Sequence, residues 1–292
     1  MPTPKGGGVG ILCAFIMVCV LVNAPLLFWV PSFFLSLLSL FGDRNHLNPG
    51  LRLVVQFGMA LLFLIEVDRT LVSNVHEYLN ILLTILTFSF FAVFIVGTAN
   101  YFNFMDGING IAGITGIVGF FLVAVYGVIS GADSKYVVIS VSIALSCAGY
   151  LPFNIPRAKV FMGDVGSVLL GFVFACMVVV LSKDLSDFIC TAAFLFPFYA
   201  DELTTMVIRI HDGDNLTRPH RKHIYQLLAN EFGIAHWKVS AGYGLAQLFV
   251  GISVIIIKPL GIVALLAVLG GYFYICTQFS VYVRKRAGLL DK

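Results

Sequence analysis

The chain has 292 residues, of which 59% are hydrophobic and only 11% are charged, and its mean hydropathy is +0.97. Soluble domains are roughly 45–50% apolar, so this composition excludes an ordinary soluble protein. The net charge of +3 comes from basic residues dispersed among polar loops, which is typical of membrane topology and argues against nucleic-acid binding. We therefore expect one all-α, polytopic transmembrane domain over residues 1–292.

Apolar windows of about 20 residues, the length that crosses a bilayer as a helix, define the expected spans. They cover residues 51–66, 79–97, 111–130, 136–153, 167–182, 188–206, 240–257 and 260–283. In segment 9–41, Asn23, Ala24 and Pro25 predict a turn that makes a hairpin of two short spans, and one strongly tilted span is the alternative. The hairpin gives about ten spans and places both termini on the same side of the membrane.

The basic residues predict the orientation of these spans. One side carries Lys5, Arg44, Arg52, Arg157, Lys159, Arg209, Arg218, Arg221, Lys222, Lys238, Arg284, Lys285, Arg286 and Lys292, and the other carries Arg69, Lys135, Lys183 and Lys258. The positive-inside rule makes the richer side cytoplasmic. The loops rich in Asp, His, Asn and Gly lie on this side, so we expect both termini and the active site to face the cytoplasm.

The six cysteines lie within apolar segments and form no CxxC pair, so we expect neither disulfides nor a zinc site. The opening residues lack the features of a cleavable signal peptide. The longest polar segment, 209–238, is expected to be a cytoplasmic loop in which residues 223–231 form a short interfacial helix.

The first polar motif covers residues 100–113, after the span at 79–97. Asn100, Asn103 and Asp106 recur every three residues, so on a helical turn they would project to one side. Oxygen ligands of this kind suit an anionic ligand that is held through a metal. The alternative is a capped helix end, where Asn and Asp bind unpaired backbone N–H groups.

The second motif, Phe-Met-Gly-Asp-Val-Gly-Ser over residues 161–167, places Asp164 between glycines at the start of a span. An ionisable group at a membrane boundary is a functional candidate. Magnesium is bound through one or two carboxylates and completes its coordination with phosphate and water, so Asp164 is a candidate metal ligand. A helix cap is again the alternative.

The third motif, residues 218–226, contains His220, His223 and three cations within six residues. This density suits diphosphate binding. A basic juxtamembrane patch attracted to anionic lipid explains it equally well. The pairs Asp43-Arg44 and Asp201-Glu202 are expected to be interfacial charges.

In this order and at these positions, the three motifs resemble those of the polyprenyl-phosphate N-acetylhexosamine-1-phosphate transferases. The resemblance extends over almost the whole chain. Residues 2–8, Pro-Thr-Pro-Lys-Gly-Gly-Gly, are similar to the family's first cytoplasmic loop. Residues 149–154, 161–164 and 220–226 are similar to its O-antigen-initiating branch.

The resemblance implies transfer of a sugar 1-phosphate from a UDP-sugar to undecaprenyl phosphate, with release of UMP, in the bacterial inner membrane. Mg²⁺ is the implied cofactor. By analogy, Asp164 and the amide oxygen of Asn103 would hold the metal, while Phe161 would stack on uracil. The other implied substrate-binding residues are Asn100, Asn109, which would bind the uracil edge, Gly163 and Arg221. The implied catalytic residues are Asp43, Asp106, His220 and His223.

The chain departs from the family pattern at two places. The family has two adjacent aspartates where this chain reads Gly42-Asp43, so the first acidic position is missing. The family's usual first span and the polar residues after it are also missing, so a divergent chain, a truncated chain and a wrongly assigned start are all open interpretations. These departures favour the alternative of a catalytically weakened homologue that binds the lipid carrier or assists assembly.

A secondary transporter is disfavoured because its charges would lie near the bilayer midplane, whereas the acids here cluster at one interface. The sequence leaves open which sugar is transferred and whether the protein forms a homodimer.

Overall fold

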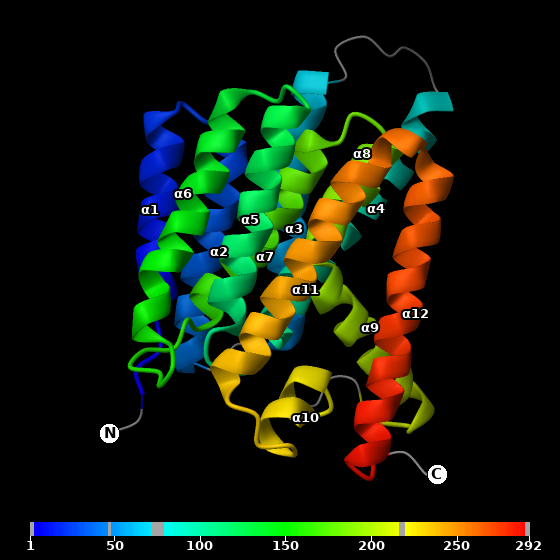
Figure 1. Ribbon diagram of the computed structural model, residues 1–292. Helices are drawn as coiled ribbons and strands as arrows, with labels where there is room; N and C mark the ends of the chain where they lie inside the picture. The colour runs from blue at the N-terminus through cyan, green and yellow to red at the C-terminus, as the bar shows by residue number, and fades with distance from the viewer. Residues whose placement is uncertain (1–2, 46–47, 72–78, 216–219, 290–292) are drawn as a thin grey trace.

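The computed structural model describes residues 3–45, 48–71, 79–215 and 220–289. The regular elements of this part of the chain are all helices (Figure 1). They are α1 Gly8–Leu21, α2 Leu26–Asn45, α3 Pro49–Leu71, α4 Leu79–Phe104, α5 Ile111–Ile129, α6 Ser134–Tyr150, α7 Asp164–Leu181, α8 Leu185–Ala192, α9 Phe196–His211, α10 Ile224–Asn230, α11 His236–Ile257 and α12 Ile262–Arg286, with short 3-10 turns at Leu151–Phe153, Ala193–Leu195 and Lys258–Leu260.

The prediction of a polytopic helical membrane protein is confirmed. Seven described helices, α3 to α7, α11 and α12, are long and apolar enough to cross a bilayer. Two shorter apolar helices, α1 and α2, form the predicted hairpin. Asn23 adopts a left-handed φ of 51°, and the Ala24 N–H donates to the Cys19 carbonyl at 2.8 Å, which closes the turn.

The segment predicted as one span over 188–206 is instead divided into α8 and α9 by the turn at Ala193–Leu195. Pro197 lies in the first turn of α9, where its missing N–H costs no helical hydrogen bond. Helix α9 carries Asp201, Glu202 and Arg209, all of which are buried. The break therefore directs a charged helix into the protein and away from lipid.

Helix α7 is the core of the bundle, with nearly every side chain buried. It contacts α1 and α4 through glycines: a Cβ on Gly8 would lie 2.3 Å from Gly166 Cα, and a Cβ on Gly171 would lie 2.8 Å from Ala99 Cα. These close approaches fix the first half of α7 against two neighbouring helices.

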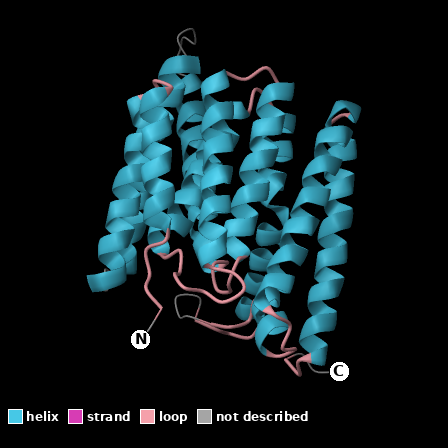
Figure 2. Cartoon of the chain, turned by 60° about the vertical axis from the view of Figure 1, so that its left-hand side comes forward, coloured by secondary structure: helices cyan, strands magenta, loops and turns pink. Residues whose placement is uncertain are grey.

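Both termini lie at the same end of the bundle, which we call the N/C end (Figures 1 and 2). The loops around residues 104–110, 151–163, 212–215 and 231–235 lie at this end, and α11 and α12 diverge toward it (Figure 1). Lys135, Lys183 and Lys258 follow or begin the turns at the opposite end. The polar motifs therefore share one end of the molecule.

Candidate active site

A pocket of about 260 Å³ at the N/C end combines the first two sequence motifs. It is lined by Lys5, Asn103, Asp106, Gly107, Ile108, Asn109, Asn154, Phe161, Met162, Gly163 and Asp164. Of the site residues expected from the sequence, six line this pocket although they come from two segments more than 50 residues apart.

The amino-terminal segment forms one edge of this pocket. The N–H groups of Gly6 and Gly7 donate to the Phe161 carbonyl at 3.2 and 2.9 Å, and the Phe161 N–H donates to the Pro4 carbonyl at 2.9 Å. These bonds hold Lys5 at the pocket. Sequence reasoning recognised the Pro-Thr-Pro-Lys-Gly-Gly-Gly segment as a loop but did not include Lys5 among the site residues.

Helix α7 begins at the pocket with Asp164 as its first residue. Gly163, just before it, has φ +74° and ψ 166°, a conformation that favours glycine. Helix amino termini attract anions because their first N–H groups are unpaired and the helix dipole is positive there. Gly163 therefore has a conformational role in directing α7 toward the pocket.

Asp164 makes polar contacts with two other helices. Its Oδ2 accepts a hydrogen bond from the Arg52 guanidinium at 2.5 Å, and its Oδ1 accepts one from Asn103 Nδ2 at 3.1 Å. Asn103 Nδ2 also donates to Ser167 Oγ at 2.8 Å. Sequence reasoning missed Arg52, because it meets Asp164 only through the packing of α3 and α7 against their shared neighbours α2 and α4.

Asp106 faces the same pocket from the loop after α4. Burial, together with the nearby charge of Asp164, raises the pKa of Asp106 to about 8. Asn100 has a different environment: its amide pairs with Gln56, with Asn100 Nδ2 donating to Gln56 Oε1 at 2.8 Å. The three residues do not share one face, because α4 ends at Phe104, before Asp106.

The donor set of this pocket fits magnesium bound together with a phosphate ligand. Among the described residues, no group of three His, Cys, Asp or Glu side chains could hold a metal alone. The pocket instead offers two carboxylates, Asp106 and Asp164, and the Asn103 amide oxygen. Mg²⁺ needs only one or two carboxylates when substrate phosphate and water complete its coordination.

The loops that carry Asn109 and Phe161 are held by side-chain hydrogen bonds. Asn154 Oδ1 accepts from the Gly110 N–H at 2.5 Å, and Asn154 Nδ2 donates to the Val160 carbonyl at 3.0 Å. Phe161 keeps 41% of its surface exposed beside the pocket. An exposed aromatic face next to polar groups is able to stack on a planar base.

A second pocket, of about 750 Å³, adjoins the first and runs along α3 and α4. It is lined by Pro49, Arg52, Leu53, Gln56, Phe57, Val93, Val96, Gly97, Asn100, Asn103, Phe104, Arg209, His220, His223 and Gln226. Asn103 lines both pockets, and Arg52 lines the larger one while it bonds Asp164 in the smaller one. One end of the larger pocket is therefore polar and meets the smaller pocket, and the rest is mostly apolar.

The basic residues of the third motif, which we call the basic loop, contribute unequally to these two pockets. His220 lines the larger pocket, and burial followed by the charge of His223 lowers the pKa of His220 to about 4. Its imidazole is therefore neutral at pH 7. Arg221 is exposed and lines neither of these two pockets, and Lys222 pairs with Asp212 and Asp214 at 2.7 and 2.8 Å.

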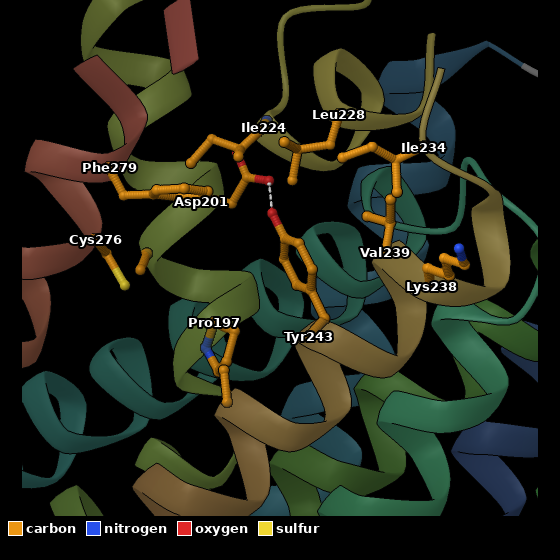
Figure 3. Close-up of a pocket in the computed structure, with 13 residues that line it drawn as sticks. Pro197, Asp201, Ile224, Leu228, Ile234, Lys238, Val239, Tyr243, Cys276 and Phe279 are labelled. Carbon is orange, nitrogen blue, oxygen red and sulfur yellow. Dashed lines mark hydrogen bonds between the residues drawn. The ribbon is translucent and has the colours of Figure 1, made fainter. Parts of the chain in front are cut away.

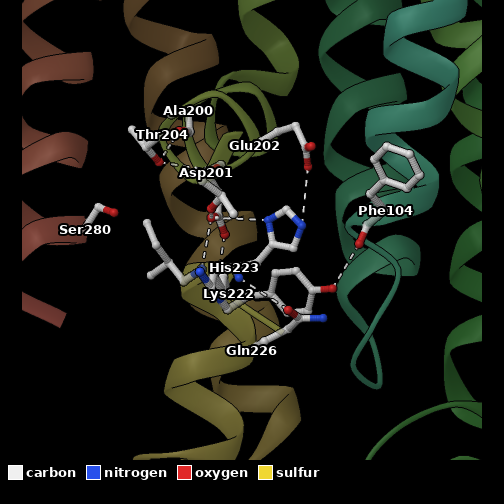
Figure 4. Close-up of polar contacts among 12 residues, drawn as sticks. Phe104, Ala200, Asp201, Glu202, Thr204, Lys222, His223, Gln226 and Ser280 are labelled. Carbon is white, nitrogen blue, oxygen red and sulfur yellow. Dashed lines mark hydrogen bonds and ion pairs between the residues drawn. The ribbon is translucent and has the colours of Figure 1, made fainter. Parts of the chain in front are cut away.

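His223 is buried between two acids of α9 (Figure 4). Its Nδ1 lies 3.6 Å from Asp201 Oδ1 and its Nε2 lies 3.5 Å from Glu202 Oε2. Asp201 also accepts from the backbone N–H groups of Ile224 and Tyr225 at 3.0 and 3.3 Å. It therefore caps α10, which begins at the predicted position.

The expectation that Asp201 and Glu202 are interfacial charges is wrong, because both are less than 5% exposed. The break before α9 turns them inward, where His223 and the start of α10 meet them. The sequence did contain a signal for the pairing of these acids with His223: two adjacent acids are followed by a loop with two histidines.

The loop after α4 packs against α10. Tyr225 Oη donates to the Phe104 carbonyl at 3.0 Å, and a Cβ on Gly107 would lie 2.2 Å from that Oη. The third motif is thus placed directly beside the first. The side chain of Asp43 lies outside the described residues, while Gly42 belongs to the end of α2.

Comparison with known proteins identifies the family. The glycosyl transferase family 4 model matches residues 25–182, more than half of the chain. Among similar proteins, the decaprenyl-phosphate N-acetylglucosaminephosphotransferase of Mycobacterium leprae is 36% identical over 129 residues, which cover 39% of this chain and 31% of the relative. The undecaprenyl-phosphate alpha-N-acetylglucosaminyl 1-phosphate transferase of Thermotoga maritima is 35% identical over 115 residues, covering 38% of each chain.

The phospho-N-acetylmuramoyl-pentapeptide-transferase of Staphylococcus saprophyticus is 31% identical over 144 residues, covering 44% of each chain. The chain thus spans less than half of the length of each of these three relatives in the matched regions. The sequence resemblance, the helical membrane architecture and the family match agree. The chain belongs to glycosyl transferase family 4.

Proposed function

We propose that the protein transfers a sugar 1-phosphate from a UDP-sugar to undecaprenyl phosphate, which produces a lipid-linked diphosphate sugar and UMP. One observation carries the proposal: a small acidic pocket meets a larger, mostly apolar pocket at Asn103, at one end of a membrane bundle. A polar nucleotide-sugar and a membrane-bound acceptor need adjoining sites of these two kinds. The names of the relatives support the same class of reaction.

In the proposed reaction, an oxygen of the acceptor phosphate attacks the phosphorus that carries the sugar. The bond between this phosphorus and the bridging oxygen of the UDP diphosphate breaks, and UMP leaves with that oxygen. Phosphoryl transfer depends mainly on alignment and charge stabilisation. Of the cations that line or adjoin the two pockets, Arg52 and Lys5 would stabilise the phosphates, whereas Arg209 is paired with Asp214. Phe161 would stack on uracil.

Asp164 and Asn103, assisted by Asp106, would hold Mg²⁺, which would supply positive charge beside the donor diphosphate. The acceptor phosphate is mostly a dianion above its second pKa, near 6, so it needs little help from a general base. The absence of an acid at Gly42 is therefore compatible with turnover. The roles of His220, His223, Arg221, Asn100, Asn109 and Asp43 remain those that the family resemblance implies.

We further propose that the N/C end faces the cytoplasm of a bacterial inner membrane, where UDP-sugars are available, and that the product starts an envelope polysaccharide such as O-antigen. The distribution of basic residues supports this orientation. In a cysteine-free chain, a membrane-impermeant maleimide added to intact cells should label Ser134→Cys and leave Lys159→Cys unlabelled. The opposite pattern would overturn the orientation.

An assay of the purified protein tests the reaction. The protein is incubated with undecaprenyl phosphate, Mg²⁺ and a panel of UDP-sugars that includes UDP-N-acetylglucosamine and N-acetylated dideoxy sugars. We expect one donor to give equal amounts of lipid product and UMP, and chelation of the metal to stop both. If no donor gives UMP, the proposed activity is wrong.

Gly42 favours one alternative function, in which the protein binds the lipid carrier without turnover. This alternative predicts saturable binding of undecaprenyl phosphate with no UMP from any donor. Gly42→Asp should then restore UMP release if the missing carboxylate is the cause.

A further inference from the structure

A third pocket, of about 400 Å³, lies between α9, α10, α11 and α12 at the N/C end (Figure 3). Its lining is apolar except for Lys238, the buried carboxylate of Asp201 and the Tyr243 hydroxyl. The apolar residues that matter below are Gly242, Ala246, Cys276, Phe279 and Leu228. The two pockets of the active site share none of these residues.

The pocket lies at the depth of one membrane leaflet. Lys238, Gly242 and Ala246 follow the start of α11, so they extend over roughly 15 Å from its N/C end. Cys276 and Phe279 belong to about the last three turns of α12. Both helices are candidate membrane spans, and they diverge toward this end (Figure 1), so the pocket lies where lipid can reach it.

Two glycines show that the two sides of α11 differ. A Cβ on Gly244 would lie 2.4 Å from Ile114 Cγ2, because that side of α11 packs against α5. A Cβ on Gly242, which lines the pocket, would meet no atom within 4 Å. The pocket side of α11 is therefore open, and a lipid chain can enter it without displacing protein.

The charge at the pocket selects the kind of lipid. Lys238 is exposed, and its ammonium group lies 5.7 Å from the centre of the Trp237 ring. Tryptophan and lysine at the end of a span are typical of the headgroup region, where cations attract anionic lipid. Apart from Lys238, Asp201 and the Tyr243 hydroxyl that donates to Asp201, the lining is apolar, as an acyl chain requires.

We propose that this pocket binds one acyl chain of an anionic phospholipid, with the lipid phosphate paired with Lys238. The chain would pack against Leu228 and Ile224 of α10, beside the Asp201 carboxylate, which accepts from Tyr243 Oη at 2.6 Å. Because Asp201 also caps α10 and contacts His223, the bound lipid supports the helix that follows the basic loop. This site goes beyond the proposed transferase activity and does not depend on it.

Native mass spectrometry of the full chain, released from detergent micelles with phosphatidylglycerol or phosphatidylcholine added, tests the proposal. Gly242→Leu fills the pocket, and Gly270→Leu, on an exposed and open position of α12, is its matched control. Lys238→Gln removes the cation at the pocket. Its control, Lys285→Gln, removes an exposed cation from α12 at the same N/C end of the bundle. Thermal unfolding checks that each variant is folded.

We expect the wild type to prefer phosphatidylglycerol, and Lys238→Gln to weaken its binding about fivefold, the contribution of one interfacial cation. Gly242→Leu should remove the tightest bound lipid, while Gly270→Leu and Lys285→Gln should retain it.

Equal lipid binding by Gly242→Leu and Gly270→Leu would contradict the proposal that the lipid occupies this pocket. Equal effects of Lys238→Gln and Lys285→Gln would contradict the contact between Lys238 and the lipid phosphate. Displacement of phosphatidylglycerol by equimolar undecaprenyl phosphate would show that the carrier, not a phospholipid, is the occupant. Lipid binding is measured without turnover, so an inactive protein does not affect this test.

Discussion

Asp164 and Asp187 are both carboxylates in the first turn of a helix, and each pairs with a cation from a distant segment, but at opposite ends of the bundle. The Asp187 carboxylate has protein partners on both oxygens and is only 3% exposed. It pairs with Lys258 and accepts hydrogen bonds from Tyr126 Oη at 2.5 Å and from the Lys183 N–H at 2.9 Å. Asp164 instead keeps 27% of its side chain exposed, at a pocket.

The difference between these two regions separates a structural ion pair from a binding site. Around Asp187 each partner is protein, so the pair closes the ends of α8 and α11 against α5. Beside Asp164 there is space for a ligand and a second acid, Asp106, with a raised pKa. An ion pair alone does not indicate function, whereas an ion pair beside a second carboxylate and a cavity does.

The largest expected effect is that of Asp164→Asn on activity. We expect turnover to fall roughly a thousandfold or more, because the metal provides several kcal/mol of charge stabilisation in the transition state. The melting temperature should change little, since the amide occupies the same volume. Steady-state assays and thermal unfolding of the same preparation measure both quantities. Wild-type activity in this variant would contradict the metal assignment.

Arg52→Gln should have a smaller effect on turnover, about 10–100-fold, because loss of one hydrogen bond to a charged phosphate costs roughly 1.5–3 kcal/mol. Since the Arg52 guanidinium bonds the Asp164 Oδ2 that the metal would take, its loss should not raise the Mg²⁺ concentration that gives half-maximal activity. A magnesium titration at saturating donor measures this. A large increase in the magnesium requirement would indicate that Arg52 orients Asp164 for the metal instead of binding phosphate.

Asp187→Asn should show the reverse pattern and is the matched control for Asp164→Asn. Breaking this pair should lower the melting temperature by about 5–10 °C, since a buried ion pair loses one partner while Lys258 stays partly exposed. Activity at a temperature well below unfolding should remain within about twofold of the wild type, because Asp187 lies at the opposite end of the bundle from the candidate site. Loss of activity without loss of stability would contradict the assignment of Asp187 to a structural ion pair.

The smallest effect concerns His220 and pH. Its pKa in the folded protein is about 4, below its ordinary value of 6.5, so the unfolded chain binds more protons between these two values. The folded state is therefore destabilised as the pH falls from 6.5 to 4. In His220→Gln the melting temperature should depend less on pH in this window. An unchanged pH profile would show that His220 does not contribute.

The spans were predictable because lipid requires long apolar helices, and Asn23 to Pro25 marked the hairpin turn. The break between α8 and α9 was not, because Ala193, Phe194 and Leu195 continue the apolar pattern and only Pro197 signals a helix start. Hydropathy records composition, whereas α9 packs against α4, α11 and α12, which are distant from it in sequence.

The candidate site was predictable to the extent that its residues lie in short motifs. Asn103, Asp106 and Asp164 line one pocket, as the motifs indicated. Arg52 and the pairing of His223 with Asp201 and Glu202 depend on helix packing, so local sequence did not reveal them. The three-residue spacing of Asn100, Asn103 and Asp106 wrongly predicted a shared helix face, because α4 ends at Phe104, before Asp106.

Transfer from UDP-sugar labelled with ³²P at one phosphorus tests the central claim most directly. With the donor identified by the panel, undecaprenyl phosphate and Mg²⁺, label on the phosphorus next to the sugar should appear in the lipid product, and label on the phosphorus next to uridine should appear in UMP. Asp164→Asn should give neither product, and Asp187→Asn should give both. If the first label stayed in a water-soluble nucleotide while the lipid gained sugar, or if Asp164→Asn produced labelled lipid at the wild-type rate, the account would be contradicted.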